Sequence, residues 1–481
     1  MKKLLYGGIA LLLFSLLAYF NLENIVNWLA SGKKEPQVVS KDELPYIKNE
    51  FVVTMPINKD SAASLFKYLC SQGLVQRKVC NCGARLELWG SDGDVKFNPD
   101  TDPPQGGGDT SLIAINIPQT NNIKKMALPK ANLVYVGHTI ARNYRIIDYL
   151  TPTESSGRIM CTPEKPIGTA SSIRDSAEVT VSVIDTGVDT TVTELSPYLI
   201  RNTLPSTFCQ PQREGIFGFN ILNRRNEDAY LEPVDKDGEQ VLSRFGLNAY
   251  KHGHGTFING IIAGFGYYLN RPIPINTNVR LHLLNVKIGE KRTDVVSLFD
   301  ALCAIHYSLQ KGAKVINASW SIAPTAAKSL TLQATFYPTL VEIANAHATL
   351  VTSAGNDGVS NPNNSNVWPA GFSRNSFFGQ YIITVGAWDT ERNSVRPTSN
   401  QSNIVDIYAA GEKIMMYRSS STIPMWQASQ YGTSFAAAFV SREVAILKGQ
   451  YPSLSANAIK QRIVSLSAMS ATSHRVFTPS N

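Results

Sequence analysis

Charged residues are scarce in this sequence: Asp, Glu, Lys and Arg make up 17% of its 481 residues, and the formal net charge is +8. The sequence contains no dense block of lysine and arginine with interleaved aromatic residues, so its charge does not indicate a nucleic-acid partner. No short internal repeat is present. Apolar residues contribute 43%, which is typical of a globular protein with a core. The length allows two or three domains.

Cysteine is also sparse, with six residues, a number that is compatible with an exported protein. Cys303 lies in an apolar helical pattern and is expected to be a buried thiol. A trio nearer the N-terminus can hold one disulfide or remain as free thiols, because a thiolate metal site would lack a fourth ligand. The trio consists of Cys70, Cys80 and Cys82.

One long uncharged apolar run occupies residues 4–20, directly after two lysines. It is at the short limit for crossing a bilayer and a little long for the apolar region of a signal peptide. No clear cleavage site of small residues follows it. We therefore expect an apolar helix within a signal-anchor or transmembrane segment at 1–34 that contacts the membrane, with a cleaved signal as the alternative. The remainder of the chain is expected to be exported, either anchored by its N-terminus or secreted after cleavage.

The sequence predicts a small domain between two linkers within residues 35–177. Residues 35–48 are polar and are expected to form a linker. Residues 49–150 combine strand patterns with a helical pattern closed by Gly73, which predicts a small α+β domain. A Ser/Thr/Pro-rich linker is expected at 151–177.

Strand and helix patterns alternate through residues 178–470, before an expected tail at 471–481. The strands are continuously apolar, which indicates that both of their faces are buried. This pattern predicts an α/β domain with a parallel sheet and helices on both faces. Ligands of such sheets bind at the carboxyl ends of the strands.

Four polar residues lie where that rule places a site. Asp185 ends a predicted strand, while His254 and Ser434 each begin a predicted helix. A serine hydroxyl becomes a nucleophile when a base takes its proton, and an aspartate can hold that base in one tautomer. Asn356 follows another strand, and its amide can donate to an oxyanion, a contribution of about 3 kcal/mol to the barrier.

The segments around these residues resemble the four signatures of the subtilisin-like serine proteases, the subtilases, in the same chain order. The resemblance covers about residues 178–467 and implies a subtilisin-like sheet and a serine endopeptidase acting on polypeptides. It also implies that Asp185 orients the general base His254, that Ser434 is the nucleophile and that Asn356 is the oxyanion donor. The segments are "VIDTGVD", "HGHGTFINGIIAG", "SAGNDG" and "GTSFAAAFV".

The resemblance also implies residues that bind the substrate. The segment "KVINASWS" resembles the family strand that pairs with the substrate backbone, so Ser319, Trp320 and Ser321 are expected to line the cleft. Ala354 and Gly355 are expected at the rim of the primary side-chain pocket.

No metal ligands and no cofactor are expected from the sequence. His252 and His254 could form a metal-binding pair, but no further ligand cluster accompanies them, and His252 is expected to be a solvated loop residue. Calcium often binds subtilases, but no clear calcium site is present. Residues 234–240 carry carboxylates and are expected to form a solvated loop.

Two alternatives remain open. The small domain at 49–150 has the position of a subtilase propeptide, in which case a cut within 151–178 would free the protease from its anchor. The other reading is an accessory domain that stays attached. For the whole chain, the alternative to an enzyme is a catalytically silent binding or scaffold protein on the same fold.

Overall fold

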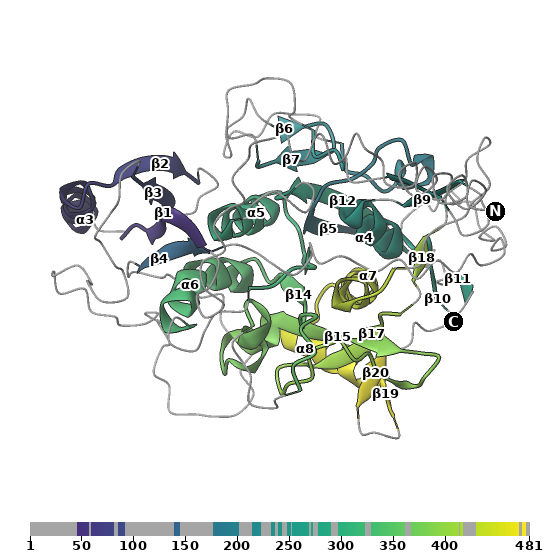
Figure 1. Cartoon of the computed structure of the whole chain (residues 1–481). Coiled ribbons are helices and arrows are strands. Elements are labelled where there is room, and N and C mark those ends of the chain that lie inside the picture. Colours follow the sequence, from purple (N-terminus) through teal and green to yellow (C-terminus); the bar gives the residue numbers. More distant parts are fainter. Residues whose placement is uncertain are drawn as a thin grey trace, which may run out of the picture. The chain divides into compact units, whose positions relative to one another are not determined.

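The structure is a computed structural model of the chain, shown in Figure 1. The expected apolar helix at residues 4–20 lies outside the residues that it describes. Within the described part, no helix is long and apolar enough to cross a bilayer. The described residues are 46–56, 59–80, 85–91, 139–144, 177–201, 214–222, 232–235, 239–242, 248–251, 253–268, 271–272, 278–289, 297–322, 329–360, 367–412, 414–416, 430–470 and 474–477.

Four antiparallel strands and one helix form an N-terminal module. The strand order is β2-β3-β1-β4, and the buried core includes Phe51, Leu69 and Trp89. The helix ends two residues before Gly73, whose φ is +74°. The module consists of β1 (Tyr46–Thr54), α3 (Lys59–Ser71), β2 (Val75–Val79), β3 (Leu86–Gly90) and β4 (Thr139–Tyr144).

The linker expected at 35–48 is too long at its C-terminal end. Strand β1 already begins at Tyr46, which pairs with Tyr144 of β4. Polar side chains in this short stretch suggested a linker, but the backbone hydrogen bonds of the sheet include it.

The main sheet is largely parallel, as predicted for residues 178–470. Its order is β19-β20-β17-β15-β14-β13-β5-β12-β7-β6, and the pairs from β20 through to β7 are all parallel (Figure 1). Its strands are β5 (Ala177–Asp185), β6 (Glu214–Gly215), β7 (Gly218–Asn220), β12 (Val279–Lys287), β13 (Val315–Ala318), β14 (Thr349–Ser353), β15 (Ile382–Asp389), β17 (Ile407–Ala410), β19 (Ala468–Met469) and β20 (Arg475–Phe477), with β16 (Ser394–Val395) paired to β15.

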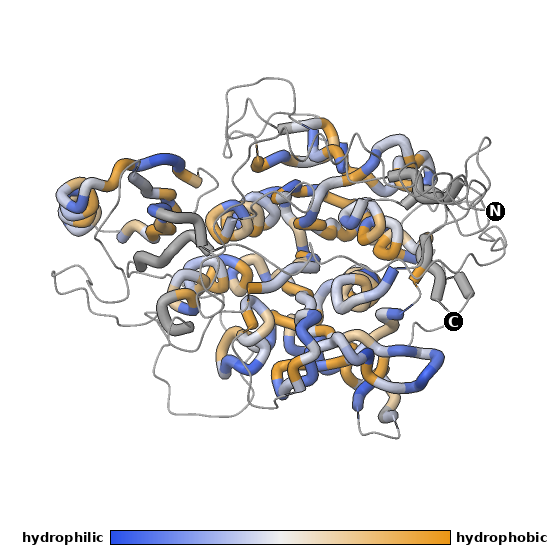
Figure 2. The backbone as a smooth tube through the Cα atoms, in the orientation of Figure 1, coloured by the Kyte–Doolittle hydropathy of each residue, from blue (hydrophilic) through white to orange (hydrophobic). Residues whose placement is uncertain are grey.

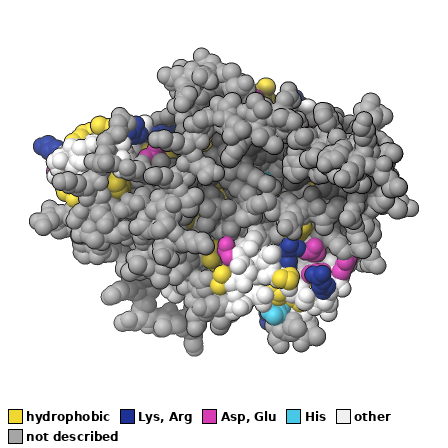
Figure 3. Space-filling model, in the orientation of Figure 1, with side chains coloured by type: hydrophobic (Ala, Val, Ile, Leu, Met, Phe, Trp, Pro, Cys, Tyr) yellow, Lys and Arg dark blue, Asp and Glu magenta, His cyan; other side chains and the backbone are white. Residues whose placement is uncertain are grey.

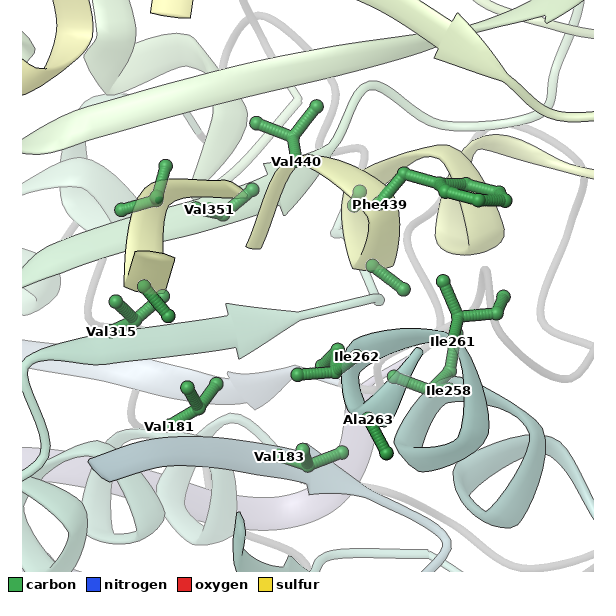
Figure 4. Close-up of a cluster of buried hydrophobic side chains, with 14 of the residues drawn as sticks. Val181, Val183, Ile258, Ile261, Ile262, Ala263, Val315, Val351, Phe439 and Val440 are labelled. Carbon is green, nitrogen blue, oxygen red and sulfur yellow. The ribbon is translucent and has the colours of Figure 1, made fainter. Parts of the chain in front are cut away.

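Helices cover both faces of this sheet, which confirms the predicted layering. Val181 and Val183 of β5 pack in a core with α4 (His254–Ala263) and α7 (Thr433–Gln450), as Figure 4 shows. Ser182 between them points to the other face, where its hydroxyl lies 2.7 Å from that of Ser308 in α5 (Leu298–Gln310). Helix α6 (Ser329–Asn345) packs beside α5, and α8 (Ala456–Leu466) packs beside α7.

The expected tail at 471–481 contains a strand of the main sheet. Val476 and Phe477 of β20 are buried and pair with Tyr408 and Ala409 of β17. The three-residue strand is too short to show an apolar period in the sequence, so burial against the sheet edge decides its conformation.

Two further groups of short strands complete the described elements. One sheet contains β10 (Gly266–Tyr268), β11 (Arg271–Pro272) and β18 (Met415–Met416), and the other contains β8 (Glu239–Leu242) and β9 (Asn248–Lys251). Figure 2 shows apolar residues concentrated along the strands of the main sheet and the helices packed on it.

Charges of both signs lie together on the surface. In Figure 3, several described Lys and Arg side chains lie beside Asp and Glu side chains at the lower right of the face shown. Arg392 pairs with Asp389 at 3.5 Å, and Arg396 pairs with Glu412.

A disulfide joins the N-terminal module to the domain of the main sheet. Cys80, which follows β2, is bonded to Cys303 in α5. The expectation that Cys303 is a thiol is therefore wrong, because its position in an apolar helix concealed a partner 223 residues away. Cys70 is a free, exposed thiol, and Cys82 lies outside the described residues.

Candidate active site

Asp185 and His254 are joined by a hydrogen bond at the carboxyl end of β5. His254 Nδ1 lies 2.8 Å from Asp185 Oδ1, and that oxygen also accepts the backbone N–H of Thr186 at 2.8 Å. Asp185 is fully buried, while the His254 side chain is 16% exposed. A carboxylate can only accept, so these partners assign the proton of a neutral imidazole to Nδ1 and leave a lone pair on Nε2.

The first turn of α4 is held by two side chains that fix the position of His254. Thr186 Oγ1 accepts the N–H of Gly255 at 2.8 Å. Asp235 Oδ2 accepts both the N–H and the hydroxyl of Thr256, at 2.9 and 2.6 Å. These bonds satisfy N–H groups that have no acceptor within the helix. Gly253 precedes the helix because a Cβ there would lie 2.0 Å from the carboxylate of Asp235.

The expectation of a solvated loop at 234–240 is wrong for Asp235. Its side chain is buried, and its neighbour Val234 forms a parallel bridge with Val188. A carboxylate in a polar loop has the same sequence pattern whether it is solvated by water or hydrogen-bonded to a helix N-terminus. The contact with α4 could not be read from the segment itself.

Ser434 lies in the first turn of α7, after a glycine with φ of +139° at position 432. Its hydroxyl donates to the carbonyl of Ser319 at 3.1 Å, and the Ser319 hydroxyl donates to the carbonyl of Ser434 at 2.9 Å. The ring of the next residue, Phe435, lies 5.4 Å from the ring of His254 between centroids. The structure thus brings the Asp185–His254 pair and the start of α7 to the same side of the sheet.

Asn356 lies directly beside the start of α7. Its Oδ1 accepts the N–H of Thr433 at 3.0 Å and the hydroxyl of Thr433 at 3.1 Å. Both bonds use the carbonyl oxygen of the amide, which assigns the NH2 group to the other side. That NH2 group makes no hydrogen bond to any residue that the structure describes, so it is available as a donor next to Ser434.

Asn400 holds the loop that carries Asn356, a role that the sequence did not suggest. Its Nδ2 donates to the carbonyl of Ala354 at 2.9 Å, and its Oδ1 accepts the N–H groups of Asp357 and Val359 at 3.1 and 3.0 Å. Asn400 is buried. A lone asparagine in the polar segment after β16 carries no sequence signal for such a contact.

The residues expected to bind substrate follow the ends of β13 and β14. Ser319, Trp320 and Ser321 are fully buried as whole residues, backbone included. Ala354 is also fully buried, and Gly355 has φ of +94°.

A chain of buried hydrogen bonds connects this region with the middle of α7. The Ser441 hydroxyl donates to Asn317 Oδ1 at 2.8 Å, and Asn317 Nδ2 donates to Ser319 Oγ at 2.9 Å. Ser319 in turn binds the backbone of Ser434. The nucleophile candidate is thus positioned from both β13 and its own helix.

Comparison with known families decides the classification. The model of the family described as "Subtilase family" matches residues 176–477, well over half of the chain. The chain belongs to the subtilase family. It is therefore a subtilisin-like serine peptidase, a hydrolase, as the four motifs predicted.

Individual relatives are distant from this subtilase. Subtilisin DY from Bacillus licheniformis is 26% identical over 229 residues, which cover 47% of this chain and 75% of that protein. Fervidolysin from Fervidobacterium pennivorans, described as a keratinolytic enzyme related to subtilisin, is 17% identical with a TM-score of 0.52. The match covers 90% of this chain and 59% of fervidolysin, and it indicates a shared fold. A cold-adapted subtilisin-like serine proteinase is 16% identical with a TM-score of 0.43, covering 63% of this chain and 89% of that one.

Metal ligands do not gather in the part of this subtilase that the structure describes, where no group of three or more His, Cys, Asp or Glu side chains is placed to hold an ion. His252 lies outside that part. Asp235, the one carboxylate of 234–240 with a described side chain, binds the start of α4.

Proposed function

We propose that this subtilase is a serine endopeptidase in which Ser434 attacks the peptide carbonyl and His254 takes its proton. Asp185 orients the imidazole, and Asn356 stabilises the oxyanion. The observation that supports the proposal most is the 2.8 Å bond between Asp185 and His254 Nδ1, because it leaves Nε2 as the basic nitrogen.

The reaction begins when the Ser434 hydroxyl leaves its acceptor, the carbonyl of Ser319. Rotation about the Cα–Cβ bond redirects the proton to His254 Nε2, and Oγ then bonds to the substrate carbonyl carbon. Catalytic hydrogen bonds commonly tighten only when substrate is present, so the resting orientation of the hydroxyl is compatible with this step.

Two donors receive the negative charge that develops on the carbonyl oxygen. One is the NH2 group of Asn356, whose oxygen is held by Thr433. The other is the N–H of Ser434 in the first turn of α7, where helical N–H groups have no acceptor within the helix. The protonated His254 then gives its proton to the leaving amine, and water hydrolyses the acyl-enzyme in the same manner.

The substrate is proposed to be a polypeptide bound along the backbone of Ser319, Trp320 and Ser321, with Ala354 and Gly355 at the primary pocket. Strand addition of this kind uses main-chain hydrogen bonds, so binding requires the buried backbone of these residues to become accessible. The acid–base steps use protein side chains alone, and we propose that no cofactor takes part.

Export is proposed on two grounds. The Cys80–Cys303 disulfide suits an oxidising compartment. The apolar run at 4–20 supports an N-terminal anchor or signal, and this second ground rests on sequence alone.

A peptide library incubated with the purified full chain tests the proposal. We expect cleavage within peptide chains by the wild type and none by Ser434→Ala at equal concentration. A catalytically silent scaffold protein would give identical, uncleaved profiles for the two, and that result would reject the proposal.

A further inference from the structure

The chain has two covalent routes from the N-terminal module to the main sheet. One is the backbone that runs from Tyr144, at the end of β4, to Ala177, at the start of β5. The other is the disulfide between Cys80 and Cys303, both of which are buried. Hydrolysis of a peptide bond adds water across one backbone bond and leaves the disulfide untouched.

Lys78, two residues before Cys80, adds a polar contact at the same junction. Its Nζ lies 2.8 Å from Asp300 Oδ1 in the first turn of α5, and it donates to the carbonyl of Ile221 at 3.3 Å. The ammonium also lies 5.4 Å from the centroid of the Phe299 ring. Asp300 is buried, so removal of Lys78 would leave its carboxylate without this partner in a poorly solvated place.

The helix that receives these contacts is well anchored. Ser297 caps α5 by accepting the N–H of Asp300 at 3.1 Å, and its hydroxyl donates to Asp300 Oδ2 at 2.7 Å. Beyond the junction, β3 and β4 pack against α5, and β1 and β4 pack against α6. The module therefore packs against two helices of the protease domain and is not held by the disulfide alone.

We propose that the N-terminal module is a permanent part of the mature protease, retained through Cys80–Cys303 after the backbone between residues 145 and 176 is cut. A tethered module has an effective concentration in the millimolar range at its docking surface, so the contacts of Lys78 re-form faster than the module can diffuse away. The inference goes beyond the proposed function, since it holds whichever protease makes the cut.

The tether changes what a single cut in the linker achieves. The sequence suggested that cleavage within 151–178 would free the protease from its N-terminal anchor. Everything from residue 1 to the cut is joined to Cys80 by backbone, and Cys80 is joined to Cys303. Release therefore requires a second event, either reduction of the disulfide by a thiol or phosphine or another cut closer to the N-terminus.

The experiment uses the full chain with Ser434→Ala, which prevents self-digestion, and a recognition sequence for a site-specific protease inserted in the linker. After complete cutting, we expect one band on a denaturing gel without reductant and two bands after reduction by a phosphine. Cys70→Ser is the matched control, because Cys70 is a free, exposed thiol of the same module, and it should behave like the parent protein.

Cys303→Ser should give two bands without reductant, and gel filtration of the cut, diluted protein should release at least tenfold more module than the parent. Adding Lys78→Met should increase that release further. If Cys303→Ser fails to fold, mapping of disulfide-linked peptides from the parent protein decides the matter. Two bands from the cut parent without reductant, or a free thiol at Cys303 in the peptide map, would overturn the proposal that Cys80–Cys303 retains the module. Because catalysis is disabled throughout, neither result bears on the role of Ser434.

Discussion

The guanidinium of Arg442 donates a hydrogen bond of 2.9 Å to the backbone carbonyl of Ile262. This bond connects the middle of α7, which begins beside Ser434, with the last turn of α4, which begins at His254. Burial lowers the pKa of Arg442, and the neighbouring Tyr198 and Glu443 partly offset that effect. The side chain therefore links the two helices that carry the proposed nucleophile and base.

Replacing Arg442 by methionine should lower the free energy of unfolding by about 2–4 kcal/mol, because a buried carbonyl loses its donor and the packing changes. Removing a buried charge can stabilise a protein, but here only one partner is removed, so the cost of the unpaired carbonyl dominates. Denaturant unfolding in the Ser434→Ala background measures the change. The matched control, Arg462→Met on the exposed face of α8, should cost less than about 1 kcal/mol. Equal losses for the two variants would contradict the role given to Arg442.

Asn356→Ala should reduce kcat by about 10²–10³ with little change in KM, because the donor acts on the oxyanion and not on the bound substrate. Asn356→Asp separates this role from a structural one. An aspartate can still accept from Thr433, as the asparagine does, but it has no NH2 group to donate. Both variants should therefore lose activity, as measured by steady-state peptide hydrolysis. Near-normal kcat for Asn356→Asp would show that Asn356 only positions Thr433.

Asp235→Ala should lower both stability and kcat, since it removes the acceptor for Thr256 at the start of α4, two residues after His254. Loss of such a helix cap costs about 1–2 kcal/mol. Asp235→Asn keeps an acceptor oxygen, so it should restore most of the stability and most of kcat. Thermal unfolding and initial rates, measured on both variants, check the prediction. Equal damage by alanine and asparagine would mean that the negative charge, and not the cap, is required.

Burial lowers the pKa of His306 from 6.5 to about 4, and its Nε2 lies 3.1 Å from the Thr339 hydroxyl. The imidazole of His306 binds its second ring proton more tightly in the unfolded chain than in the folded protein. The folded state therefore keeps its full free energy of unfolding above pH 6.5 and loses part of it as the pH falls towards 4. The pKa difference corresponds to about 3 kcal/mol. Denaturant unfolding of Ser434→Ala should show this loss, and the double variant with His306→Gln should have a shallower slope between pH 4 and 6.5. Identical slopes would contradict the assignment.

The sequence predicted the parallel sheet, the strand that ends at Asp185 and the helices that begin at or beside His254 and Ser434, for a physical reason. Continuous apolar strands bury both faces, and each polar residue that follows such a strand or begins a helix must lie at an edge of the sheet. The local sequence pattern was sufficient to predict these features, because local secondary structure determines where they lie.

The supporting contacts could not be predicted, because each depends on a partner far along the chain. Asp235 looked like any carboxylate in a polar loop, and Cys303 looked like any small apolar residue of a helix. Their partners are Thr256 of α4 and Cys80 of the N-terminal module. The three-residue strand β20 likewise forms only because the edge of β17 is there to receive it.

The most direct test of the account is labelling of the full chain by a fluorophosphonate probe, followed by peptide mapping. The probe forms a covalent bond only with a serine whose proton is taken by a nearby base in a preformed site. We predict that the wild type is labelled at Ser434, that Asp185→Asn reduces the labelling rate by a factor on the order of 10⁴, and that Ser434→Ala is not labelled. Labelling of the wild type at any other residue, or of Ser434→Ala at the rate of the wild type, would contradict the account.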